Sequence, residues 1–116
     1  MRVLFFLTGL VAAWVAFKLW LRRGRVRPRR ARELVDAGAL LVDVRTPQEF
    51  DRGHIDGARN MPLPRLTQDI EALGERDRAI VVYCQSGLRS RLAAARLREA
   101  GFGSVHDLGP RSAWPG

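Results

Sequence analysis

The chain has 116 residues, a formal net charge of +8 and a single cysteine. One cysteine excludes an intramolecular disulfide, so the fold does not depend on an oxidising compartment. Residues 1–32 hold 9 of the 20 basic residues and no acid, whereas residues 33–116 hold 11 basic and 12 acidic residues. The length therefore allows one small domain with a basic appendage, and the domain itself has no excess of positive charge with which to bind a nucleic acid.

Residues 3–21 form an apolar run that only Thr8, Gly9 and Lys18 interrupt. As a helix, at 1.5 Å per residue, this run extends roughly 28 Å. That length matches the hydrocarbon core of a bilayer, which is about 30 Å thick. We therefore predict that residues 1–21 form a transmembrane anchor.

An arginine-rich linker, residues 22–30, follows the apolar run. Seven arginines lie close behind the run: Arg22, Arg23, Arg25, Arg27, Arg29, Arg30 and Arg32. Only Arg2 and the α-amine precede it, so the positive-inside rule predicts a single-pass cell-membrane protein whose domain lies on the cytoplasmic side. A cleavable signal peptide is the alternative, since residues 10–13, "LVAA", resemble a small-residue cleavage site.

Residues 31–116 form the predicted folded domain, in which short apolar runs alternate with amphipathic stretches. This alternation is typical of an α/β fold. A first helix is expected in residues 30–38 and a buried strand in residues 39–44. A brief helix follows, with Thr46 as its N-cap, Pro47 at its first position and Glu49 completing a capping box.

The second half of the domain continues the alternation. Strands are expected in residues 57–63, 79–84 and 104–108, and helices in residues 64–74 and 90–100. Strands of this length joined by helices predict a parallel sheet that is covered on both faces. In such sheets ligands bind beyond the carboxyl ends of the strands, and Cys84 lies at such an end.

Cys84 stands where a strand turns into a helix, in "IVVYCQSGLRS". The first amides of a helix have no partners within the helix, so this position favours a thiolate or a bound oxyanion. The alternative is that Cys84 is a small apolar side chain that fills the core. Arg89 favours the functional interpretation, because a cation in the first turn of a helix opposes the helix dipole, whereas its planar guanidinium suits an anionic ligand.

Three segments resemble the single-domain rhodanese family. "LLVDVRTPQEFDRGHIDGARNMPL" is similar to the family's first signature, "VVYCQSGLRS" to its active loop, and "DLGPRSAWPG" to its C-terminal ending. The resemblance covers roughly residues 29–116. There are two clear departures: Gln85 stands where many members carry arginine, and Pro110 replaces the second glycine of a pair.

The resemblance implies a rhodanese-like parallel sheet of four to five strands flanked by helices. It also implies sulfur transfer from thiosulfate or a persulfide donor to a thiol, cyanide or protein acceptor, with Cys84 as the nucleophile and no metal or cofactor. The donor would be bound by the rest of the active loop, namely Gln85, Ser86, Gly87, Leu88, Arg89 and Ser90.

Other polar residues are assigned structural roles. His54 and His106 are not expected to act as a base, since a thiolate at a helix terminus needs none. Asp43 and Arg45, with Glu49, are expected to form an ion pair that ties a strand end to the next helix. Arg91 is expected to be solvated.

Two alternative functions remain at this point. A cysteine phosphatase or arsenate reductase also uses a thiolate in an anion-binding loop, but a phosphate generally calls for five residues between cysteine and arginine, and only four separate Cys84 from Arg89. A membrane-tethered persulfide carrier or docking module is the other. The intact Cys84 argues against pure docking, but it does not separate a carrier from a free sulfurtransferase.

Overall fold

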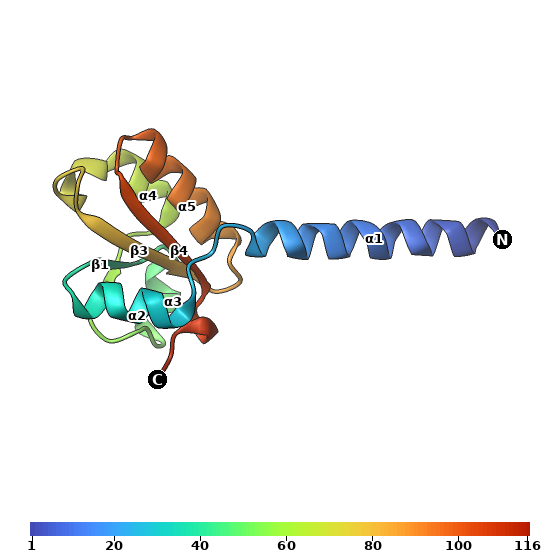
Figure 1. Ribbon diagram of the computed structural model, residues 1–116, viewed down its shortest axis with the longest axis horizontal. Coiled ribbons are helices and arrows are strands. Elements are labelled where there is room, and N and C mark those ends of the chain that lie inside the picture. Colours follow the sequence, from blue (N-terminus) through green and yellow to red (C-terminus); the bar gives the residue numbers. More distant parts are fainter.

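A computed structural model describes residues 1–116 and shows one long N-terminal helix projecting from a small α/β domain (Figure 1). The helices are α1 (Arg2–Arg22), α2 (Pro28–Asp36), α3 (Pro47–Asp51), α4 (Leu63–Gln68) and α5 (Leu88–Glu99), with 3-10 turns η1 (Ile70–Leu73) and η2 (Arg111–Ala113). The strands are β1 (Leu40–Asp43), β2 (Arg59–Asn60), β3 (Ala79–Cys84) and β4 (Ser104–Pro110).

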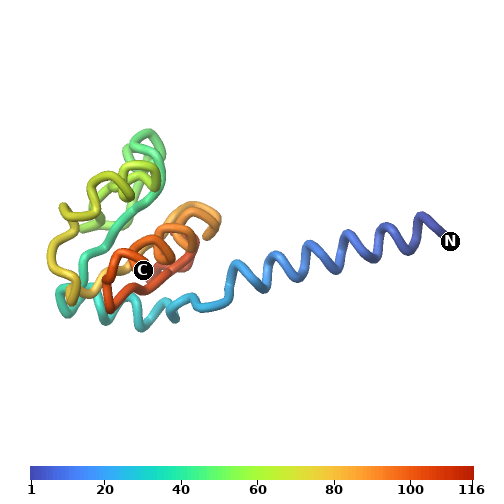
Figure 2. The backbone as a smooth tube through the Cα atoms, turned by 90° about the horizontal axis from the view of Figure 1, so that it is seen from above, coloured from blue at the N-terminus to red at the C-terminus, as the bar shows by residue number.

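Helix α1 stands clear of the domain along most of its length, as the view from above shows (Figure 2). It is long and apolar enough to cross a membrane, and its apolar window buries nothing inside the protein. Leu21, near its C-terminal end, is its only buried residue. An apolar helix with no protein partner needs another apolar environment to cover it.

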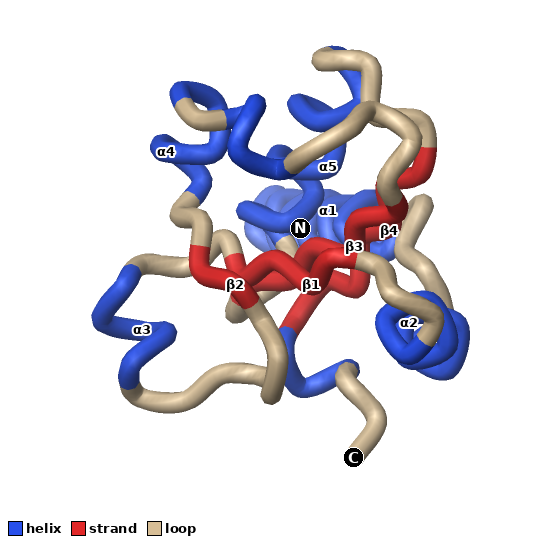
Figure 3. The backbone as a smooth tube through the Cα atoms, turned by 90° about the vertical axis from the view of Figure 1, so that its left-hand side faces the viewer, coloured by secondary structure: helices blue, strands red, loops and turns tan.

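The four strands form one parallel sheet in the order β2-β1-β3-β4. Helices α4 and α5 cover one face, and α2 lies on the other (Figure 3). The predicted α/β class, with a parallel sheet flanked by helices, is therefore confirmed, and the number of strands is four.

Alternate residues of β3 enter two separate core clusters, as a strand with both faces buried requires. Ile80, Val82 and Cys84 belong to the larger cluster, on the side of α4 and α5. Val81 and Tyr83 belong to the smaller cluster, on the side of α2. The side chain of Cys84 therefore lies on the α5 side of the sheet, at its carboxyl edge.

The predicted capping box is present, whereas the strand expected over residues 57–63 and the helix expected over residues 64–74 differ. Only Arg59–Asn60 of the expected strand form β2. The Thr46 hydroxyl accepts from the Glu49 N–H and the Glu49 carboxylate from the Thr46 N–H, so the predicted capping box is present. The single helix expected over residues 64–74 is wrong, because it breaks at Asp69, whose φ of −112° and ψ of 32° are not helical. The Asp69 side chain pairs with Arg65, four residues before it, at 3.0 Å.

Candidate active site

Cys84 is the last residue of β3, and the three residues after it turn the chain into α5. Its side chain is fully buried. Gly87 is the N-cap of α5 and has a φ of 102°, a conformation that side chains resist and glycine adopts readily. The loop thereby folds back over the sulfur that precedes it.

Two polar groups of the loop contact the Cys84 sulfur. The Gly87 N–H donates to Sγ at 3.0 Å, and the Ser90 Oγ lies 3.5 Å from the same atom. Ser90 is held in place by donating to the Gly87 carbonyl at 3.2 Å. A hydrogen bond from an N–H to sulfur strengthens when the sulfur becomes negatively charged.

The other loop residues differ in exposure. Gln85, Ser86 and Leu88 are exposed and Arg89 is half-buried, whereas Gly87 and Ser90 are buried beside the sulfur. The structure therefore brings Gly87 and Ser90 to Sγ and leaves the remaining loop side chains at the rim.

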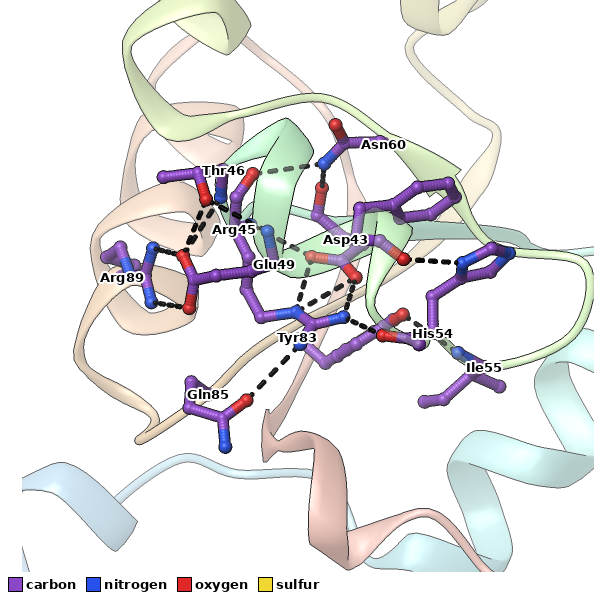
Figure 4. A network of polar contacts seen from close by, with 12 residues as sticks. Asp43, Arg45, Thr46, Glu49, His54, Ile55, Asn60, Tyr83, Gln85 and Arg89 are labelled. Atoms are coloured by element: carbon purple, nitrogen blue, oxygen red, sulfur yellow. Dashed lines mark hydrogen bonds and ion pairs between the residues drawn. The ribbon is translucent and has the colours of Figure 1, made fainter.

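Arg89 is held by Glu49, a pairing that the sequence did not predict. The two Nη atoms of Arg89 donate to the two carboxylate oxygens of Glu49 at 2.7 Å and 2.9 Å (Figure 4). These hydrogen bonds, followed by the one from the Thr46 N–H, lower the pKa of Glu49 from 4.5 to about 2. The same pair raises the pKa of Arg89 above its ordinary value.

The expected pair of Asp43 and Arg45 is present, but it does not include Glu49. The Arg45 Nη2 donates to the Asp43 carboxylate at 2.7 Å, and both side chains are buried. Arg45 also donates to the Gly53 carbonyl at 2.7 Å and to the Gln85 Oε1 at 3.2 Å (Figure 4). This buried cation thus joins the end of β1 to the loop after α3 and to the residue that follows the cysteine.

Neither histidine contacts Cys84. The His54 Nδ1 lies 2.9 Å from the Phe50 carbonyl, and its ring stacks on Phe50. The His106 Nε2 lies 2.9 Å from the Ser104 Oγ, and burial lowers the pKa of His106. Each imidazole therefore has a polar partner within four residues of its own position. The chain contains no group of three or more His, Cys, Asp or Glu side chains that could hold a metal ion.

A groove of about 620 Å³ opens on the α2 side of the loop. Gln85 lines it together with His54, Arg111 and Trp114. Trp114 packs against the smaller core cluster and also forms part of this wall. The groove could not be predicted from the sequence, because its walls come from segments far apart in the chain.

Arg25 is a second feature that the sequence did not reveal. Its side chain lies directly against Gly87 of the loop and against Gly109 of β4. In the sequence, Arg25 is one of seven closely spaced arginines, and nothing in that pattern separates it from its neighbours.

A comparison with protein families matches residues 27–110 to the model described as "Rhodanese-like domain". The chain belongs to the rhodanese-like family. The matched residues include all four strands and the loop from Cys84 to Ser90.

Relatives and solved structures agree with this assignment. The thiosulfate sulfurtransferase GlpE of Stutzerimonas stutzeri is 38% identical over 84 residues, which cover 72% of this chain and 76% of GlpE. The uncharacterized protein YqhL of Bacillus subtilis is 44% identical over 70 residues, which cover 60% of this chain and 55% of YqhL. The structure titled "rhodanese with anions from E. coli" aligns with a TM-score of 0.63 and 30% identity, over 67% of this chain and 95% of that one.

Proposed function

We propose that this rhodanese-like protein is a membrane-anchored sulfurtransferase in which Cys84 carries sulfur as a persulfide. The observation that carries the proposal is the Gly87 N–H aimed at the Cys84 sulfur at 3.0 Å, at the start of α5. The similarity of the chain to a thiosulfate sulfurtransferase and to the structure titled "rhodanese with anions from E. coli" supports the same chemistry.

The reaction takes two displacement steps, as nucleophilic catalysis by a cysteine requires. The Cys84 thiolate attacks the outer sulfur of thiosulfate, the sulfur–sulfur bond of the donor breaks, and its electron pair leaves with sulfite. An acceptor thiolate or cyanide then attacks the outer sulfur of the Cys84 persulfide, and the Cys84 thiolate leaves. No external oxidant or reductant is consumed.

Binding of the donor falls to the loop. Residues 85–90 provide amides at the N-terminus of α5, where negative charge is stabilised. Arg89 supplies a guanidinium whose outer N–H groups stay free for sulfonate oxygens while the inner ones bind Glu49. Ser90 and Gly87 hold the sulfur, and Gln85, Ser86 and Leu88 form the rim around it.

Helix α1 serves in this proposal as the membrane anchor, with the domain on the cytoplasmic side. Its length and its apolar, unburied surface support the anchor, and the arginines that follow it support the orientation. Residues 1–21 then form the anchor, 22–30 the basic linker, which runs into the start of α2 at Pro28, and 31–116 the rest of the domain.

A persulfide carrier is the second candidate, and the groove beside Gln85 favours it. A groove of about 620 Å³ exceeds what a small anion such as thiosulfate fills, and it suits a thiol-bearing molecule or a peptide segment. In this version a protein persulfide, rather than thiosulfate, loads Cys84.

Intact mass of the full-length chain in detergent micelles tests the proposal. Incubation with thiosulfate should add one sulfur atom and release one sulfite, and Cys84→Ser should gain nothing while keeping its circular dichroism spectrum. Loading only from a protein persulfide would favour the carrier. A sulfur adduct on Cys84→Ser, or no adduct from either donor, would refute persulfide chemistry at this site.

A further inference from the structure

The side chain of Arg25 is wedged between two glycines of the candidate active site. A methyl group added at Gly87 would overlap the Arg25 Nη2, and one added at Gly109 would lie 2.6 Å from Nε and 2.8 Å from Cζ. Both glycines have positive φ angles, 102° and 86°. The guanidinium therefore occupies the space that a Cβ atom would need at Gly87 and at Gly109.

The Arg25 guanidinium has donors to spare. Its Nε is buried and has no hydrogen-bond partner. The side chain takes part in none of the six ion pairs of the chain. An unpaired buried donor is costly. Arg25 therefore keeps its positive charge beside the loop without an ion-pair partner, at the cost of one unpaired donor.

The backbone of this segment fixes where the cation lies. The backbone of Arg25 forms an isolated parallel β-bridge with Asp107 of β4, the edge strand of the sheet. The Val26 N–H donates to the Asp107 carbonyl at 2.8 Å. The buried Asp107 carboxylate accepts from the Gly109 N–H at 2.9 Å. Arg25 is thus attached both to the loop and to the strand that supports it.

The end of α1 is fastened to the same region. The guanidinium of Arg91, expected to be solvated, lies over the Trp20 ring at 4.0 Å, and its Nη1 donates to the Arg23 carbonyl at 2.6 Å. Leu21, the next residue after Trp20, is buried. The segment that carries Arg25 is therefore held at both sides rather than hanging free.

We propose that Arg25 is a positioning residue of the Cys84 loop, which supports Gly87 and supplies a positive charge that draws anionic reagents to the sulfur. The inference rests on the proposed function for the identity of the natural donor, and it assigns a role in the site to the juxtamembrane segment. Gln85 leaves the first loop position uncharged, so a cation from outside the loop matters more here.

Two measurements on the full-length chain in detergent micelles test this. The first is the KM and kcat for thiosulfate. The second is the ratio of the rates at which anionic iodoacetate and neutral iodoacetamide alkylate Cys84, which reports local charge without any sulfur transfer. The variants are Arg25→Met, Arg25→Lys and, as a matched control from the same segment, the exposed Arg27→Met.

Arg25→Met should raise the thiosulfate KM about tenfold with kcat unchanged, and should lower the alkylation ratio by a similar factor, as expected for a lost charge-assisted contact. Arg25→Lys should restore most of both values, and Arg27→Met should change neither. Equal losses in Arg25→Lys and Arg25→Met would show that Arg25 acts only through packing. Equal losses in Arg27→Met and Arg25→Met would show that only the total charge of the segment matters. Either result overturns the proposal. If wild-type protein takes no sulfur from thiosulfate, the proposed donor fails, and the alkylation ratio alone decides on Arg25.

Discussion

Glu49 and Arg89 form a two-point ion pair that joins α3 to α5 beside the candidate active site. Both carboxylate oxygens accept from the guanidinium, at 2.7 Å and 2.9 Å. The same carboxylate completes the capping box of α3 through the Thr46 N–H. Glu49 therefore orients the arginine of the loop and also neutralises much of its charge.

Glu49→Gln should strengthen the capture of anionic donors, because the amide keeps the shape of the side chain and removes its negative charge. We expect the thiosulfate KM to fall about twofold to fivefold, in line with the ~1 kcal/mol or less of a partly exposed pair. Steady-state kinetics measures this. Glu71→Gln is the control, since Glu71 pairs with Arg76 at the surface. A KM that rises instead would mean that orientation of Arg89 outweighs its charge.

The same pair makes stability depend on pH in acid. The folded pKa of Glu49 is lowered from 4.5 to about 2. A depressed carboxylate stabilises the fold fully above its unfolded pKa, and this contribution is lost as the pH falls from about 4.5 through about 2. Thermal unfolding of wild type and Glu49→Gln should therefore differ most near neutral pH and converge in strong acid. A difference that stays constant over this range would contradict the pairing.

Gly87→Ala should damage the loop in two ways, through its positive φ and through overlap with Arg25. Combination with Arg25→Ala should relieve the overlap but not the φ strain, so the double variant should lose less stability than the sum of the two single ones. Thermal unfolding of the four proteins measures this coupling. Strict additivity would show that the two residues are not in contact.

Gln85→Arg tests which donor the loop serves. The change removes the acceptor for the Arg45 Nη1 and adds a second cation beside it, so we expect a loss of about 1 kcal/mol in stability. If small anions are the donor, the thiosulfate KM should nevertheless fall. Gln85→Ala is the control that removes the acceptor alone. No gain with thiosulfate, together with impaired transfer from a protein persulfide, would support the carrier.

The orientation across the membrane can be checked with a C-terminal fusion. A reporter active only outside the cytoplasm should give no signal, because arginines that follow an apolar span favour the cytoplasmic side. A strong signal, or a mature chain shortened by roughly the first 13 residues, would support the signal peptide instead.

Local sequence patterns predicted the elements whose causes are local. The capping box of Thr46 and Glu49 lies within four residues, and a continuous apolar run identifies β3. The partners of Glu49 and Arg89 could not be predicted, because 40 positions separate them and each has nearer charged residues with which to pair. The pair of Asp43 and Arg45 could be predicted because the two residues lie close together in the sequence. The contact of Arg45 with Gln85 could not, because 40 positions separate them.

The position of Arg25 beside the loop could not be predicted for a different reason. Its run of arginines has a sufficient explanation in membrane topology, so no residue in it called for a second role. What distinguishes Arg25 is a steric relation to Gly87 and Gly109, and the absence of a side chain at those two positions is visible in the sequence only as two ordinary glycines.

Because Trp20, Arg23 and Val26 all contact the domain, no free linker separates α1 from the sheet. A domain on a loose tether rotates freely and sweeps a volume set by the length of its linker. Here, with α1 in a bilayer, the tilt of the helix would fix both the height of Cys84 above the lipid and the direction in which its loop opens. A partner confined to the same membrane would then meet the sulfur in one orientation, after a search in two dimensions rather than three.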